Sequence, residues 1–269
     1  MDRLGTWVAR LRAVTVGLAI SAAVAGTSLA GDLRVFSSGA PADAQKSIVA
    51  ASAAWQAGTP GTGVALTVAM PAVLLARLAA GEGADVVVMP EQALAVLERQ
   101  GKLLAGSQVA VARVGVGVVV RLGDKPPAIG TVAELRATLL ATPSLVYPDP
   151  DSEGSVAGKA IARVLQQMEI AAAVKPKTTL RHAIGGGVDM VGRGEAALGL
   201  FNISEILPVK GITLVGPLPK EVQNTITFGA AIVAGSSDVQ RGQEYIRRLR
   251  EIASAAHWQA AGLEPVGGK

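Results

Sequence analysis

One pattern occurs three times in the first hundred residues and restricts the fold more than any other feature. A short apolar run ends, a proline follows within a few residues, and a helical pattern begins. The apolar runs are Leu33–Phe36, Val64–Val68 and Asp85–Met89, and the prolines are Pro41, Pro71 and Pro90. Proline is favoured in the first helical turn, where its missing N–H costs nothing. The pattern predicts an α/β fold with three parallel strands, whose helices extend to about residues 57, 80 and 100.

The three predicted helix starts should meet at one edge of a sheet. The carboxyl ends of neighbouring parallel strands are where open α/β sheets bind ligands. Free N–H groups and the helix dipole make such an edge attractive to anions. Every α/β protein has turns of this kind, so the pattern indicates where a ligand would lie more than which ligand it is.

The rest of the chain continues the alternation of strands and helices. A run from Val109 to Arg121 predicts a strand that leaves the first unit. Thr131 and Glu134 have the spacing of a capping box, which predicts a helix to about residue 141. Further strands are expected near residues 144–147, 197–201, 212–215 and 228–233. One further helix is expected to follow a polar loop and to end near residue 168. Two more are expected near residues 238–252 and 253–261.

The first 30 residues have the pattern of a secretory signal peptide. A basic start is followed by the apolar stretch Ala13–Ala30, with small residues at Ser28 and Ala30, the two positions that signal peptidase reads. We therefore predict cleavage after Ala30 and a periplasmic location. The alternative is an uncleaved membrane anchor, although a helix of these 18 residues, about 27 Å long, is slightly short for a bilayer core.

Composition excludes several classes of function. The chain has no cysteine and only two histidines, His182 and His257, which lie far apart in the sequence. It therefore lacks the residues for a thiolate metal site, a cysteine nucleophile or a closely spaced histidine pair. The net charge is +4, but half of it belongs to residues 1–30, which contain three arginines and one acidic residue, Asp2. With 3% aromatic residues, no nucleic-acid surface is indicated. Since no acid–base pair of carboxylates is evident either, we expect a non-enzymatic protein without cofactor or metal.

Several apparent motifs fail on inspection. Gly154–Ala160 is one residue too short for a phosphate-binding loop, and Ala160 stands where the metal-binding hydroxyl belongs. The loop that begins at Asp149 opens like a calcium loop but lacks its closing glutamate. The glycine run 185–187 is typical of a tight turn, and His182 beside it is typical of a surface or hydrogen-bonded residue.

Several segments of the chain have a characteristic order and spacing. They are Val35–Ala40, Leu75–Val87, Asp149–Pro150, Arg193–Gly199, Ile203–Val209, Leu214–Pro219 and Ala261–Pro265. Taken in this order, they resemble the periplasmic molybdate-binding proteins, which are type II solute-binding proteins of ABC importers. Leu75–Val87 is similar to the family's LARxxxxGAPADVF motif, and Arg193–Gly199 is similar to its RGEAxxG motif. Ile203–Val209 and Leu214–Pro219 point to a divergent branch of the family.

The resemblance implies a two-lobed periplasmic binding protein of type II, with two mostly parallel sheets, flanking helices and crossing hinge strands. Lobe 1 would comprise residues 31–112 and 228–269, and lobe 2 would comprise residues 113–227. The implied role is to capture a small anion between the lobes, as a monomer, and to deliver it to an inner-membrane ABC permease. Alternatives with the same fold are an extracytoplasmic sensor or scaffold and a binding protein for a small organic carboxylate.

The resemblance also places a ligand site at the loops between strands and helices. The family holds its oxyanion with hydroxyls and backbone N–H groups. The corresponding positions here are Ser37, Ser38, Gly39, Ala40, Met70, Pro71, Ala72, Ser155, Ala157, Ile184 and Asn202. The family's two serines fall on Ala40 and Pro71, and its tyrosine falls on Asn202. This loss of hydroxyls argues against molybdate in particular and leaves an oxyanion or a small carboxylate as the ligand class.

Overall fold

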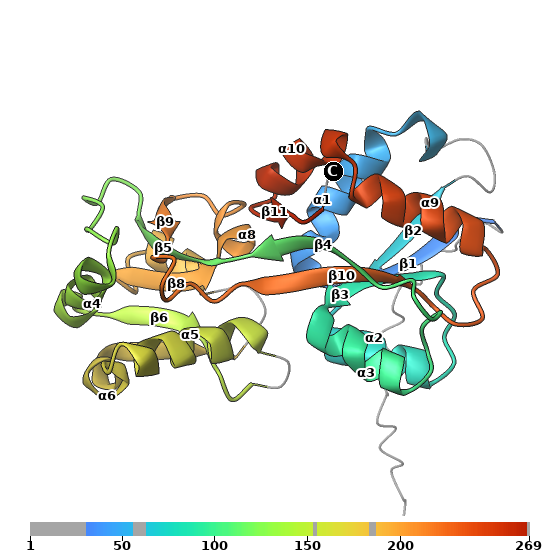
Figure 1. Cartoon of the computed structure of the whole chain (residues 1–269). Coiled ribbons are helices and arrows are strands. Elements are labelled where there is room, and N and C mark those ends of the chain that lie inside the picture. The colour runs from blue at the N-terminus through green and yellow to red at the C-terminus, as the bar shows by residue number, and fades with distance from the viewer. Residues whose placement is uncertain (1–30, 56–62, 153–154, 183–186, 268–269) are drawn as a thin grey trace, which may run out of the picture.

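The structure is a computed structural model of the 269-residue chain, and it describes residues 31–55, 63–152, 155–182 and 187–267. The predicted signal peptide and Ile184 lie outside the described residues. Two lobes are joined by a pair of long crossing strands (Figure 1). Each lobe is built on its own sheet, and we call them lobe 1 and lobe 2 in the order in which the chain enters them.

Lobe 1 contains a six-stranded sheet with the order β11-β4-β10-β3-β1-β2. Its strands are β1 (Leu33–Ser37), β2 (Val64–Val68), β3 (Val86–Pro90), β4 (Val109–Val114), β10 (Ile226–Ile232) and β11 (Glu264–Pro265). Strand β1 pairs in parallel with β2 on one side and β3 on the other. The three predicted parallel strands are thus confirmed as neighbours, and the helices that follow them begin at one edge.

Lobe 2 contains a five-stranded sheet with the order β7-β6-β8-β5-β9. Its strands are β5 (Val116–Arg121), β6 (Leu145–Pro148), β7 (Thr178–Arg181), β8 (Leu198–Asn202) and β9 (Ile212–Pro217). The predicted strand 109–121 is two strands, because Gly115 interrupts it and each half enters a different sheet. No local sequence pattern predicted β7 or the two-residue strand β11.

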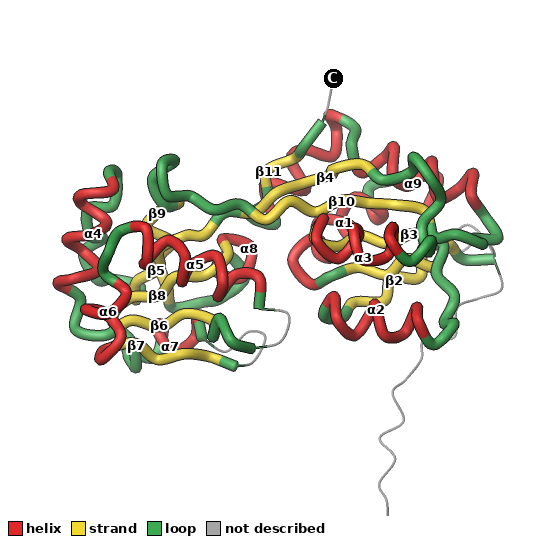
Figure 2. The backbone as a smooth tube through the Cα atoms, turned by 60° about the horizontal axis from the view of Figure 1, so that its bottom comes forward, coloured by secondary structure: helices red, strands yellow, loops and turns green. Residues whose placement is uncertain are grey.

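The two-lobed α/β architecture is as predicted, but both sheets, which were expected to be mostly parallel, are mixed. Strand β10 pairs antiparallel with β3 and β4, and β5 pairs antiparallel with β8 and β9. The antiparallel half of each sheet follows from the connection between the lobes. The chain leaves lobe 1 along β4 and returns along β10, and these two strands lie side by side (Figure 2) and pair antiparallel.

Helices cover both faces of each sheet. Lobe 1 has α1 (Gly39–Ala50), α2 (Pro71–Ala79), α3 (Glu91–Arg99), α9 (Val239–Leu249) and α10 (Ala255–Ala260). Lobe 2 has α4 (Val132–Ala141), α5 (Val156–Gln167), α6 (Ala171–Val174), α7 (Val188–Gly192) and α8 (Ile203–Ile206). Helix α1 ends before the predicted residue 57, since a 3-10 turn places Trp55 against Tyr245, with ring centroids 5.8 Å apart. No helix of the described residues is long and apolar enough to cross a membrane.

Apolar side chains of the first strand alternate between two cores. Leu33 and Val35 pack with Tyr245 and Trp258 on one face of the sheet. Phe36 belongs to the core on the other face, with Leu74 and Leu94. Two residues of lobe 2, Val156 and Ile203, also pack against the first of these cores. The lobes are therefore in contact near the hinge.

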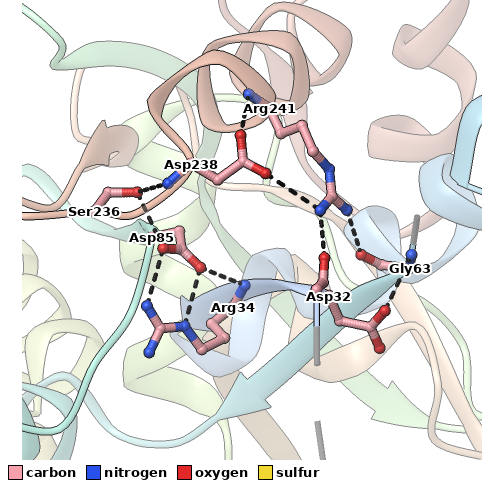
Figure 3. A network of polar contacts seen from close by, with 8 residues as sticks. Asp32, Arg34, Gly63, Asp85, Ser236, Asp238 and Arg241 are labelled. Carbon is pink, nitrogen blue, oxygen red and sulfur yellow. Dashed lines mark hydrogen bonds and ion pairs between the residues drawn. The ribbon is translucent and has the colours of Figure 1, made fainter. Parts of the chain in front are cut away.

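A polar network fastens the start of the sheet in lobe 1 to the segment between β10 and α9 (Figure 3). The Arg34 guanidinium donates from Nε and Nη2 to the Asp85 carboxylate, at 3.0 Å in each case. Ser236 donates to the same carboxylate at 3.0 Å. Arg241 donates to the Gly63 carbonyl at 2.9 Å and pairs with Asp238. Buried Asp85 is thereby fully hydrogen-bonded, as a charge in the interior requires.

Candidate functional site

A cleft of about 910 Å³ lies between the two lobes. Both lobes contribute to its wall, and so does the C-terminal helix α10. From lobe 1 the lining residues are Ser38, Gly39, Ala40, Asp43, Ser47, Val68, Ala69, Met70, Pro71, Pro90, Ile226, Phe228, His257, Ala260 and Ala261. From lobe 2 they are Pro148, Ser152, Ser155, Val156, Ala157, Arg181, His182, Gly187, Val188, Phe201, Asn202, Ser204, Glu205, Leu207 and Pro208. The size fits a small organic molecule.

The wall of lobe 1 is formed by the starts of α1 and α2. Ser38, Gly39 and Ala40 line the cleft at the first helix, and Met70 and Pro71 line it at the second. The first turns of these helices present N–H groups that have no acceptor within the helix. These groups and the helix dipole give the wall a partial positive charge.

Two of the predicted residues of lobe 1 do not line the cleft. The Ser37 side chain is fully buried, donates to the Ser38 carbonyl at 2.9 Å and accepts from Gln45 Nε2 at 2.6 Å. Its hydroxyl therefore serves the interior of the lobe. Ala72 lies in the first turn of α2 and is absent from the lining.

Few hydroxyls remain for a ligand on this wall. The Ser38 hydroxyl contacts the Val88 carbonyl at 3.4 Å, and its backbone N–H donates to the same carbonyl at 2.9 Å. Ser47 Oγ and His257 Nδ1 lie 2.7 Å apart and satisfy each other. A ligand at this wall would thus meet mainly backbone N–H groups.

In lobe 2 three predicted residues line the cleft. Ser155 and Ala157 lie at the start of α5, and Asn202 ends β8. The Asn202 side chain is buried, with 6% of the residue exposed. Its Nδ2 donates to Glu205 Oε1 at 2.7 Å, whereas its Oδ1 is buried without a partner among the described residues. Unpartnered buried polar atoms are rare in folded proteins, so this oxygen indicates a missing partner.

The strongest cationic group of the cleft comes from a residue that the sequence reasoning did not select. Arg181 ends the edge strand β7 and is half-buried, and its Nε has no partner among the described residues. Beside it, exposed His182 lies against buried Asp149, with Nδ1 and Oδ2 2.7 Å apart. Neither β7 nor the loop after it has a sequence pattern that predicts an arginine in the cleft.

A single carboxylate with unusual surroundings also lines the cleft. Glu205 lies in the short helix α8, and within the described part of the chain its carboxylate accepts a single hydrogen bond, from Asn202. Burial raises the pKa of Glu205 above its ordinary value, and the hydrogen bond from Asn202 only partly opposes this. No group of three or more His, Cys, Asp or Glu in the described residues could hold a metal ion.

Comparison with known proteins agrees with this arrangement. The family of bacterial extracellular solute-binding proteins matches residues 33–264, which include every described helix and strand apart from Pro265 of β11. The chain belongs to this family. Its fold therefore serves a protein class that binds solutes outside the cytoplasm.

Three known proteins illustrate what this chain is similar to, one in sequence and two in fold. Aconitate isomerase from Pseudomonas is 29% identical over 215 residues, which cover 76% of this chain and 79% of that protein. The substrate-binding domain of a protein named as a molybdenum ABC transporter, from Clostridium difficile, has a TM-score of 0.73 at 15% identity, covering 87% and 99% of the chains. The molybdate-binding protein of Azotobacter vinelandii has a TM-score of 0.64 at 16% identity, covering 88% and 100%.

Proposed function

We propose that this protein captures a small organic anion with carboxylate groups in the cleft between its lobes and delivers it to an ABC permease of the inner membrane. The observation that carries the proposal is the half-buried Arg181 guanidinium, whose Nε has no partner among the described residues of the cleft. A guanidinium recognises a carboxylate through parallel hydrogen bonds, and it keeps its charge at every physiological pH.

The opposite wall supports a second anionic group on the same ligand. The starts of α1 and α2 lie across the cleft from lobe 2 and offer N–H groups without a net charge. A molecule with two or more carboxylates would use both walls at once. The relative named aconitate isomerase acts on a molecule of this chemistry, which favours a polycarboxylate for this chain as well.

A tetrahedral metal oxyanion is a poorer fit. Ala40 and Pro71 replace two hydroxyl-bearing residues, and Pro71 has no N–H to offer. The remaining serines nearest this wall, Ser37 and Ser38, direct their hydroxyls to protein carbonyls. Each missing hydrogen bond to a charged ligand costs about 1.5–3 kcal/mol. The lining also includes apolar Val68, Met70 and Phe201, which suit the carbon skeleton of an organic ligand.

Capture would proceed by closure of the lobes about the crossing strands. The Gln223 side chain bridges this region, since its Oε1 accepts from the Val116 N–H and its Nε2 donates to the Val116 carbonyl, each at 2.9 Å. Closure expels water from the cleft and strengthens the hydrogen bonds to the ligand. We expect the closed form of a monomer to dock on the permease in the periplasm.

The proposal is tested by thermal unfolding of the purified protein with a panel of anions. The panel comprises cis-aconitate, trans-aconitate, citrate, malate, acetate, sulfate, phosphate and molybdate. A ligand at a hundredfold excess over its Kd stabilises the folded state by about 2.7 kcal/mol, which raises Tm measurably. A rise with polycarboxylates supports the proposal. A rise with molybdate alone, or with none of the panel, contradicts it.

A further inference from the structure

Helix α8 holds its carboxylate in a fixed place at the base of the cleft. The Ile203 N–H donates to the Gly115 carbonyl at 3.0 Å, which ties the start of α8 to the hinge. On its other side the loop of lobe 1 at Gly262 lies so close that an added Cβ would approach the Ser204 nitrogen to 2.9 Å. Glu205 is thus carried by a segment that both lobes hold.

The Glu205 carboxylate has the surroundings of a proton acceptor and not those of a carboxylate in an ion pair. Among the described residues no cation neutralises the carboxylate, and the donor to it is the Asn202 amide. Burial disfavours its charged form, and a carboxylate with a raised pKa takes up a proton more readily. This differs from the other described carboxylate that lines the cleft, since Asp43 pairs with Lys46.

Two polar atoms beside Glu205 lack partners among the described residues. They are Asn202 Oδ1 and Ser204 Oγ, and both residues line the cleft. If Glu205 had only a structural role, its carboxylate would be expected to accept a hydrogen bond from the neighbouring Ser204 hydroxyl. Because buried polar atoms are nearly always hydrogen-bonded, we expect a ligand in the cleft to supply the missing hydrogen bonds.

On these grounds we propose that Glu205 is a catalytic base that moves a proton between two carbons of a bound unsaturated polycarboxylate. This rests on the proposed function, because Arg181 and the helix starts must first hold the carboxylates of the ligand. The proposal goes beyond the expectation from sequence that the protein only binds.

The step needs no oxidant, reductant or cofactor. Glu205 takes a proton from a methylene carbon that lies next to both a carboxylate and a carbon–carbon double bond. The electron pair of the broken C–H bond spreads over the allyl system and the carboxylates at its ends, where Arg181 and the N–H groups stabilise the charge. Protonated Glu205 returns the proton to the far alkene carbon. The double bond moves by one position, and the carboxylate of Glu205 is restored.

The test follows the isomers of aconitate by proton NMR in deuterium oxide with the purified protein. We expect cis-aconitate to convert to trans-aconitate, with deuterium entering the methylene position. Because positioned bases contribute about 10²–10⁴-fold to rate, Glu205→Gln should lower the conversion by that factor. The Gln variant keeps the shape of the side chain and its bond to Asn202, so its Tm rise with cis-aconitate should persist.

Glu221→Gln is the matched control, since Glu221 is an exposed glutamate of the same lobe. This variant should convert cis-aconitate at the rate of the unchanged protein. Binding without conversion by the unchanged protein, or equal conversion by Glu205→Gln, would overturn the catalytic proposal and leave the proposed function intact. Failure of both aconitates to raise Tm would overturn the ligand class itself.

Discussion

At the scale of single residues, the proposed binding of a carboxylate depends on Arg181. Replacing it by glutamine removes the charge and most donors and keeps the side chain only as far as the position of Nε. Since a hydrogen bond to a charged group contributes about 1.5–3 kcal/mol, we expect Arg181→Gln to raise the Kd for the best polycarboxylate about 10–100-fold. Isothermal titration calorimetry measures this directly.

The control for this variant is Arg163→Gln, because Arg163 is an exposed arginine on α5 of the same lobe. It removes the same charge without touching the cleft. Equal losses of affinity in both variants would mean that only the general field of lobe 2 attracts the anion, and Arg181 would then have no specific role.

Asp85 is a buried carboxylate at the centre of the polar network of lobe 1. Burial alone would raise its pKa, but hydrogen bonds from the Arg34 side chain, the Arg34 N–H and Ser236 outweigh it and lower the pKa below the ordinary 3.8. We expect Asp85→Asn to reduce the free energy of unfolding by about 2–4 kcal/mol at pH 7, since it leaves Arg34 without its anion. Urea denaturation measures the loss.

The same variant predicts a dependence on pH with a definite sign. A depressed pKa contributes stability that is complete above the unfolded value and is lost as the pH falls through the folded value. The difference between the unchanged protein and Asp85→Asn should therefore be constant from pH 7 to about pH 5 and shrink below about pH 4. A difference that stays constant down to pH 3 would show that the carboxylate charge does not matter.

At the scale of elements, α4 shows that local sequence can determine a helix start. The Thr131 hydroxyl accepts from the Glu134 N–H at 3.2 Å, and the Glu134 carboxylate accepts from the Thr131 N–H at 3.0 Å. We expect Thr131→Ala to lower the free energy of unfolding by about 1 kcal/mol, with no change of ligand affinity. Glu134→Gln should retain most of the stability, because glutamine also completes a capping box. A large loss with Glu134→Gln would contradict this account.

The difference between local and long-range interactions explains how much of the fold and the site could be predicted from the sequence. The strand–proline–helix units and the capping box follow from neighbours in the chain, and the structure confirms them. Strand β7 is four residues on the edge of a sheet, and its existence depends on pairing with β6. The position of Arg181 in the cleft follows from that pairing. Glu205 likewise gains its raised pKa only from burial by segments distant in sequence, so no local pattern marks it as part of a site.

At the scale of the whole molecule, the two lobes should approach each other when the ligand binds. The chain has no cysteine, so a pair of spin labels can be placed without background. Gln92 on α3 and Lys159 on α5 are exposed and belong to different lobes. With both changed to labelled cysteine, we expect the mean distance between the labels to shorten and its distribution to narrow when a saturating polycarboxylate is added.

The control pair places both labels in lobe 1, at Gln92 and Arg247, which lies exposed on α9. Their distance should not change with ligand, because a hinge motion leaves each lobe rigid. If neither pair responds to a ligand that raises Tm, the cleft binds without closing, and the crossing strands serve as a rigid connection. A change in both pairs would mean instead that the ligand rearranges lobe 1 itself, and the contacts of Val156 and Ile203 with its core would be the place where this begins.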